Sequence, residues 1–128
     1  MGFINDRVLD SGLGILPAEA NRLDICHTPP TTYAQATSTY TVAYKTSPSI
    51  GSPVARSPTG RKVVVAAISG GTVTYTSTSA ADDAQYWAIS DTANSRLLAA
   101  GDLAAAQYVT SGNTFTLTSF DIGIPGPA

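Results

Sequence analysis

Residues 113–118 read Asn-Thr-Phe-Thr-Leu-Thr, and residues 72–76 read Thr-Val-Thr-Tyr-Thr. In both stretches an apolar side chain alternates with threonine, and successive side chains of an extended chain point to opposite faces. Each stretch is therefore predicted to form a β-strand with one face in a core and the other in water. Threonine suits the wet face, because its restricted χ1 angle packs well on a pleated surface. The two stretches predict a β protein with a hydroxyl-rich exterior.

Further strand-like segments, separated by turn residues, follow one another along the chain. Apolar runs and alternations predict strands at 23–26, 40–45, 62–68, 85–90 and 95–99. Ser69-Gly70-Gly71 predicts a hairpin turn that leads from 62–68, a strand expected to be covered on both faces, into a strand at 72–79. The alanine-rich run 96–107 is predicted to form two short strands around a turn at Gly101-Asp102.

In the last apolar stretch, the apolar residues switch from odd-numbered to even-numbered positions. Phe115 and Leu117 share one face, whereas the apolar residues of 120–124 follow the opposite alternation. A bulge or bend near Thr118-Ser119 would bring both sets to a single core, as at the corner of a sandwich. About eight or nine short strands separated by turns predict an all-β fold, an antiparallel two-sheet sandwich or a jelly roll.

The predicted organisation is one domain preceded by an arm. A chain of 128 residues is most simply a single domain that buries its core without staples. Residues 1–22 predict an N-terminal arm or short helix, and residues 23–128 the sandwich. Residues 46–59 contain three prolines and four serines, which predict a long loop suited to contacting a partner. The candidate partner-contacting residues are the larger apolar residues of these two segments: Phe3, Ile4, Val8, Leu9, Ile50, Pro53 and Val54.

Composition and charge argue against several classes of partner. Charged residues make up only 12% of the chain, about half the usual ~25%, so the surface repels neighbouring proteins weakly. A net charge of −2 without a basic stripe argues against nucleic acid. No signal-like leader and no apolar run near ~18 residues occur, so we expect a protein made in a cytoplasm without a membrane partner.

No residue pattern indicates catalysis, a metal or a cofactor. Cys26 and His27 are neighbours on a predicted strand, so their side chains face opposite sides and cannot form a thiolate–imidazolium pair. We expect a buried structural Cys26, with no disulfide partner in the chain, and a surface His27. Zinc requires three or four such ligands, and Asp82-Asp83 lie in a polar run typical of a solvated turn. We therefore expect that the protein is not an enzyme.

A set of short motifs spans most of the chain in a fixed order: Asp10-Ser11-Gly12-Leu13, Leu23-Asp24-Ile25-Cys26, Pro30-Thr31-Thr32-Tyr33, Gly60-Arg61-Lys62, Trp87-Ala88-Ile89-Ser90-Asp91, Ser95-Arg96-Leu97-Leu98-Ala99 and Thr110-Ser111-Gly112-Asn113-Thr114-Phe115-Thr116-Leu117. Together they resemble a family of small virion proteins encoded by tailed bacteriophages. The resemblance implies a structural protein, and in particular a capsid decoration or cement protein. Such a protein would sit on the capsid surface and fasten subunits of the major capsid protein. The low charge adds the expectation of a homo-oligomer, a dimer or a trimer.

Two other functions stay open at this point. One is a different virion part, a tail or head–tail connector protein. The other is a carbohydrate-binding domain at a fibre tip, in which Trp87, Tyr86 and Tyr108 would form an exposed stacking platform. A core position for Trp87 is the favoured interpretation, because the residue lies in the middle of a predicted strand.

Overall fold

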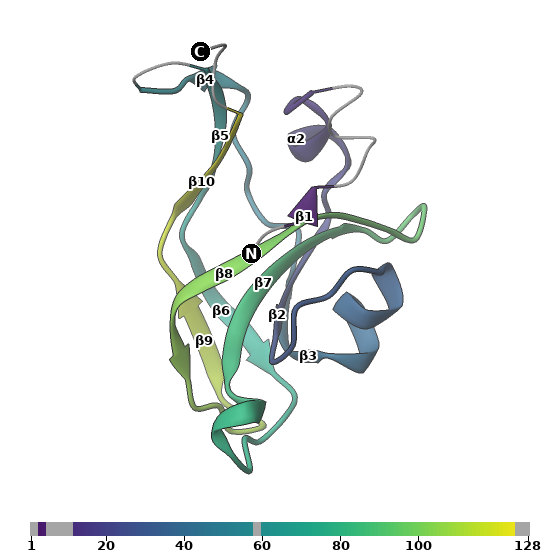
Figure 1. Ribbon diagram of the computed structural model, residues 1–128, viewed down its shortest axis with the longest axis vertical. Helices are drawn as coiled ribbons and strands as arrows, with labels where there is room; N and C mark the ends of the chain where they lie inside the picture. Colours follow the sequence, from purple (N-terminus) through teal and green to yellow (C-terminus); the bar gives the residue numbers. More distant parts are fainter. Residues whose placement is uncertain (1–2, 5–11, 58–59, 125–128) are drawn as a thin grey trace.

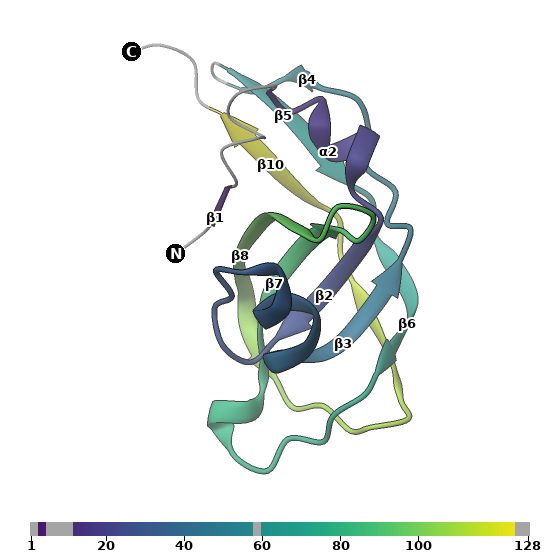
Figure 2. The same cartoon turned by 90° about the vertical axis from the view of Figure 1, so that its right-hand side faces the viewer.

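The computed structural model describes residues 3–4, 12–57 and 60–124. They form an all-β fold of two antiparallel sheets, which confirms the predicted fold class (Figures 1 and 2). Ten strands are present in this part of the chain: β1 (Phe3–Ile4), β2 (Arg22–Cys26), β3 (Thr41–Thr46), β4 (Val54–Ala55), β5 (Arg61–Val65), β6 (Ile68–Val73), β7 (Ala84–Asp91), β8 (Arg96–Gln107), β9 (Thr114–Leu117) and β10 (Phe120–Ile124). Three short helical segments join them: α2 (Ile15–Glu19), the π-helix η1 (Gln35–Thr39) and the 3₁₀ helix η2 (Ala80–Asp82).

The larger sheet has seven strands in the order β1-β8-β7-β2-β3-β6-β9, and the smaller has three in the order β10-β5-β4. The large sheet curls, and the small sheet packs across one end of its concave face (Figure 1). A single apolar cluster fills the space between them, with Leu23 and Ile89 from the large sheet and Val63, Val65 and Ile122 from the small one. Each such buried side chain contributes about 1.5–3 kcal/mol to folding.

One antiparallel ribbon joins the two sheets. Val65 of β5 faces Phe120 of β10, and three residues further along each strand Ile68 of β6 faces Leu117 of β9, so the register continues through the corner. The bend predicted near Thr118-Ser119 is confirmed, because these two residues separate β9 from β10. The bend brings both alternations into one core: Phe115, Leu117, Phe120 and Ile124 all pack against the central cluster.

The strand predicted at 62–68 is wrong in its extent and in its burial. Strand β5 ends at Val65, and Ala66 and Ala67 are exposed at the corner of the ribbon. Val63 and Val65 are buried, whereas Val64 between them is only half-buried. The small sheet therefore has one covered face, which carries Val63 and Val65.

The predicted hairpin turn at Ser69-Gly70-Gly71 is wrong. These residues lie inside β6, where Gly70 has φ +70° and the pairing with β9 shifts between Ile68 and Gly71. Such a shift is a β-bulge, which bends a strand without reversing it. Gly71 also makes room for an aromatic ring, because a Cβ there would lie 2.1 Å from Cε1 of Phe115. Of the alternating stretch 72–76, only the first two residues lie in β6.

The turn predicted at Gly101-Asp102 is also wrong, because 96–107 forms the single strand β8. Gly101 pairs with Trp87 of β7, and a Cβ on Gly101 would lie 2.7 Å from Cζ2 of the indole ring. The glycine therefore provides space for the ring and does not reverse the chain. The pairing then shifts, with Ala84 of β7 facing Gln107, so the second half of β8 bulges and bends.

The N-terminal segment contributes to both the sheet and the core. Ile4 lies in β1, which pairs with Ala99 and Ala100 of β8. Val8 and Leu9 lie outside the described residues. A helix does follow later, at α2, and its fully buried Leu16 belongs to the core between the sheets.

Candidate functional site

Three of the residues predicted to contact a partner lie in strands, and these strands belong to two different sheets. Phe3 and Ile4 form β1 at the edge of the large sheet, whereas Val54 lies in β4 at the edge of the small sheet. Thr46 ends β3, and the rest of the described segment, 47–57, is a loop as predicted apart from the two-residue strand β4 and a bridge between Ile50 and Val65. The structure therefore separates the two candidate contact segments.

The loop residues differ in how available they are. Ile50 packs against the core, and the carbonyl oxygen of Pro53 accepts a hydrogen bond from Nη2 of Arg61 at 3.1 Å. Val54 is 46% exposed, a high value for a valine. Val54 is thus the loop residue that offers an apolar side chain to a neighbour, while Ile50 anchors the loop.

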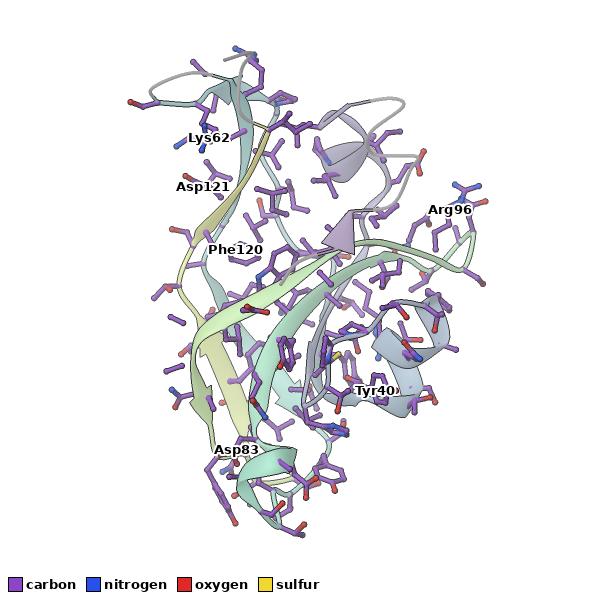
Figure 3. All side chains as sticks on the ribbon, in the orientation of Figure 1. Tyr40, Lys62, Asp83, Arg96, Phe120 and Asp121 are labelled. Carbon is purple, nitrogen blue, oxygen red and sulfur yellow. The ribbon has the colours of Figure 1, made fainter. Side chains whose placement is uncertain are left out.

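Basic residues lie close to Val54 in the small sheet, where Lys62 pairs with Val54 and Arg61 pairs with the neighbouring Ala55. Arg56, Arg61 and Lys62, three of the seven basic residues of the chain, lie on or beside β4 and β5. Nζ of Lys62 lies 2.9 Å from Oδ2 of Asp121 on β10, and both side chains face solvent (Figure 3). We call Val54, Arg56, Arg61, Lys62 and Asp121 the apical surface.

The apical surface also contains a polar hollow. A space of about 340 Å³ is lined by Arg56, Ser57, Lys62, Asp121 and Gly123. The Arg56 side chain lies across Gly123, where a Cβ would come within 2.9 Å of its Cδ. Apolar, cationic and hydrogen-bonding groups are thus available together on one small sheet.

One buried carboxylate, on β2, is held by the hydrogen-bond donors around it. Asp24 is fully buried, and its carboxylate accepts hydrogen bonds from Nε and Nη2 of Arg22 at 2.8 and 2.9 Å and from the Thr41 hydroxyl at 2.7 Å. Burial raises the pKa of Asp24 above its ordinary value despite these donors, and the hydrogen bond to Asp24 raises the pKa of Arg22. The Arg22 guanidinium also reaches the carbonyl of Thr37 in η1 and lies 4.6 Å from the Tyr44 ring centroid. The cluster therefore fixes η1 onto the sheet.

The alternation of residues 23–26 did not reveal that Asp24 is buried. Strand β2 is buried from Leu23 to Cys26, because the core covers one face and η1 lies near the other. The available signal was the spacing Arg22-x-Asp24, which places opposite charges on one face of a strand.

Cys26 has the buried structural role expected of it, whereas His27, expected at the surface, is half-buried. Cys26 is buried, its thiol donates to the Ala36 carbonyl at 3.5 Å, and burial raises its pKa to about 12. His27 is half-buried, with Nδ1 2.7 Å from the Thr28 hydroxyl and its ring beside Tyr40. A thiol with such a pKa is not a nucleophile at neutral pH.

The three aromatic residues considered for sugar stacking do not form a common platform. Trp87 packs between the sheets, with its ring centroid 4.7 Å from that of Phe120. Tyr86, its neighbour on β7, packs on the opposite face with Cys26 and Ala36. Tyr108 is 69% exposed in the connection after β8. The interpretation of Trp87 as a core residue is the one the packing supports.

The described part of the chain contains no group of three or more His, Cys, Asp or Glu side chains placed to hold a metal ion. Asp82 is partly exposed at the end of η2, and its hydrogen bond with the Thr78 hydroxyl lowers its pKa. None of the helices in the described ranges is long and apolar enough to cross a membrane.

Comparison of the chain with protein-family models, with curated proteins and with solved structures found no match.

Proposed function

We propose that this protein is a structural component of a tailed-bacteriophage virion, a capsid decoration or cement protein that bridges subunits of the major capsid protein. The observation that carries the proposal is the apical surface. It combines an exposed Val54 with three cationic side chains on a small sheet, while the buried charged and thiol groups of the described residues are used in packing. The ordered motifs that resemble small virion proteins support the same function.

The mechanism would be non-covalent burial at several separate contacts. The apical surface lies on the small sheet and β1 on the large one, so two different parts of one domain can meet different neighbours. Once one contact forms, the rigid domain holds the other at a high effective concentration. Each contact can then be small, provided that together they bury enough area for a stable interface.

Quantitative mass spectrometry of purified particles tests the proposal. We expect the protein in a fixed ratio to the major capsid protein, at the copy number of a surface lattice. A copy number that matches one ring would favour the tail or connector function instead. Absence of the protein from finished particles would contradict both functions.

A binding assay on particles that lack the protein tests the apical surface. We expect Val54→Asp to weaken binding about tenfold or more, because a buried unpaired carboxylate is costly at an interface. Ala93→Asp is the matched control, since Ala93 is exposed in the turn between β7 and β8 of the other sheet. Equal binding by both variants would show that Val54 lies outside the interface.

The expected homo-oligomer is part of the same proposal. Low surface charge permits copies of the chain to associate at little electrostatic cost. We expect sedimentation velocity of the free protein to show a dimer or a trimer. A monomer at all accessible concentrations would mean that the protein associates only with its capsid partner.

A further inference from the structure

The large sheet curls but does not close into a barrel. Within the described residues, its terminal strands are β1, which covers β8 only at Ala99 and Ala100, and β9, which pairs with β6 alone. Beyond Ala100, the outer edge of β8 has no partner strand among the described residues. Two stretches of unpaired strand edge therefore remain at the two ends of one sheet, Leu103–Gln107 and Thr114–Leu117.

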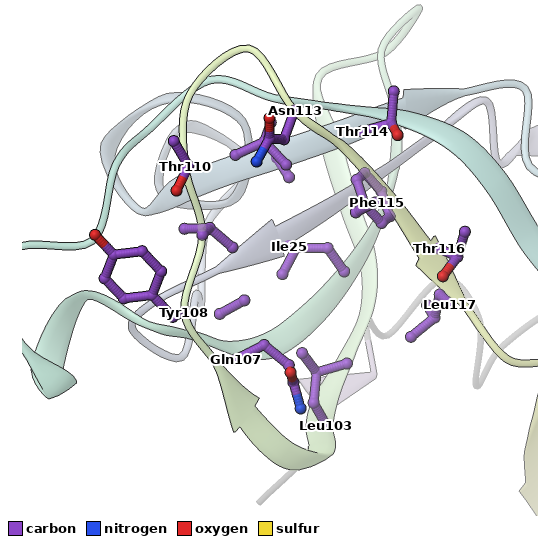
Figure 4. A pocket seen from close by; sticks show the side chains of 14 residues that line it. Ile25, Leu103, Gln107, Tyr108, Thr110, Asn113, Thr114, Phe115, Thr116 and Leu117 are labelled. Carbon is purple, nitrogen blue, oxygen red and sulfur yellow. The ribbon is translucent and has the colours of Figure 1, made fainter.

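An apolar pocket lies between these two edges (Figure 4). It has a volume of about 380 Å³, and none of its lining residues belongs to the small sheet. Ile25, Ala43 and Val73 of the central strands line it, together with Leu103 from β8 and Phe115 and Leu117 from β9. None of its lining residues is charged.

The two edges lack the groups that usually protect a strand edge. Natural sheets block free edges with lysine, proline or inward-pointing charges. None of these groups occurs in Leu103–Gln107 or Thr114–Leu117, and the charged residue nearest to them in sequence is Asp102. Residues 104–106 are three exposed alanines, whose small side chains leave the backbone accessible. The edge of β8 already accepts one added strand, because β1 pairs with it antiparallel.

We propose that this gap is an acceptor site for an extended, uncharged segment of a partner protein. The segment would pair as a strand with the free edge of β8 or β9 and place alternate apolar side chains in the pocket. Main-chain hydrogen bonds would supply affinity, and the pocket would supply selectivity for alternating sequences. The absence of charge in the lining excludes a charged segment, because its charges would lose water without gaining partners. The site is separate from the apical surface and does not depend on the proposed virion function.

A peptide titration tests the proposal. The probe is acetyl-Asn-Thr-Phe-Thr-Leu-Thr-amide, an uncharged alternating peptide, and the control peptide has the same six residues with Phe and Leu adjacent. Amide hydrogen exchange of the full chain is followed by NMR. We expect the probe, but not the control peptide, to slow exchange about tenfold at amides within 103–107 or 114–117.

Two variants locate the binding. Ala105→Lys on β8 and Thr116→Lys on β9 put a long cation at an exposed position of each edge, and at least one should weaken binding about tenfold. Ala55→Lys is the matched control, an exposed alanine on β4, the edge strand of the other sheet, and should bind as the wild type does. Unchanged chemical shifts elsewhere verify that each variant is folded.

Several results would overturn the proposal. One is the absence of slowed exchange at either edge with the probe in large excess. Another is equal binding of both peptides with shifts confined to pocket side chains, which would indicate a site for small apolar molecules. A third is protection of the same edges that rises with protein concentration alone, which would show that a second copy of the chain occupies the gap.

Discussion

At the scale of single residues, two glycines determine where the core aromatic rings lie. Gly71 provides the space for the Phe115 ring and Gly101 the space for the Trp87 ring, each facing its aromatic residue across a strand pair. Trp87 in turn contacts Phe120 of the small sheet, so the space at Gly101 affects how the two sheets pack. Neither glycine acts as a turn.

We expect Gly101→Ala to lower the free energy of unfolding by about 1–3 kcal/mol, because the new methyl group overlaps the indole ring and forces Trp87 to move. Denaturant unfolding measures the change. Gly51→Ala is the control: its Cβ would meet only the Val64 carbonyl at 3.9 Å, so the variant should unfold as the wild type does. Equal stability of both variants would show that the indole ring adapts freely.

Asp24 leads to a prediction about pH. Burial raises the pKa of Asp24, so the folded protein binds this proton more tightly than the unfolded chain does. The stability contributed at this site therefore rises as the pH falls from neutral, through the raised pKa, toward the ordinary value of about 4. The Asp24→Asn variant has no titratable side chain at this position. Urea unfolding over this pH range should therefore show the free energy of unfolding of the wild type rising relative to that of the variant as the pH is lowered. A fall in the relative stability of the wild type as the pH is lowered would mean that the hydrogen bonds from Arg22 affect the pKa of Asp24 more than burial does.

At the scale of elements, apolar burial holds the small sheet in place more than its surface ion pair does. Val65 of β5 is fully buried between the sheets, whereas Lys62 and Asp121 bridge β5 and β10 in solvent. We expect Val65→Ala to cost about 1.5–3 kcal/mol of unfolding free energy. Lys62→Ala should cost at most about 1 kcal/mol, because exposed ion pairs are screened by water. Chemical denaturation of both variants checks this order, and the reverse order would contradict it.

The success of the sequence-based predictions depended on how local each signal is. Alternation with period two correctly predicted β9, β3 and β7, and the change of parity located the bend at Thr118-Ser119, because both signals depend only on residues close together in sequence. The glycine turns failed, since the role of Gly71 or Gly101 is set by an aromatic residue on another strand. The burial of Asp24 depends in the same way on η1, a distant segment.

The candidate sites were predictable to a similar degree. The proline-rich composition of 46–59 indicated the loop that exposes Val54. The pocket between β8 and β9 was not predictable, because it exists only where the two ends of one sheet fail to meet. Which strands end a sheet is a property of the topology, and no short motif encodes it.

At the scale of the whole molecule, Cys26 reports on opening of the fold. Its side chain is fully buried next to Ala36 of η1, and its pKa of about 12 leaves almost no thiolate at pH 8. We expect a thiol reagent such as DTNB to label the folded protein only as fast as Cys26 becomes exposed. Labelling should become complete and rapid in denaturant. Rapid stoichiometric labelling under native conditions would show that η1 detaches without global unfolding.

The ribbon that turns the corner between the sheets also determines the order in which the chain can fold. Lys62 and Asp121, which pair across it, are 59 residues apart in sequence. On a ribosome, β5 and β6 emerge long before β9 and β10. The valines of β5 therefore lack their contacts with β10 while the intervening strands are synthesised. Contacts between residues so far apart in sequence form late and slowly during folding. The nascent chain is therefore most prone to aggregation in the interval before its last strands emerge.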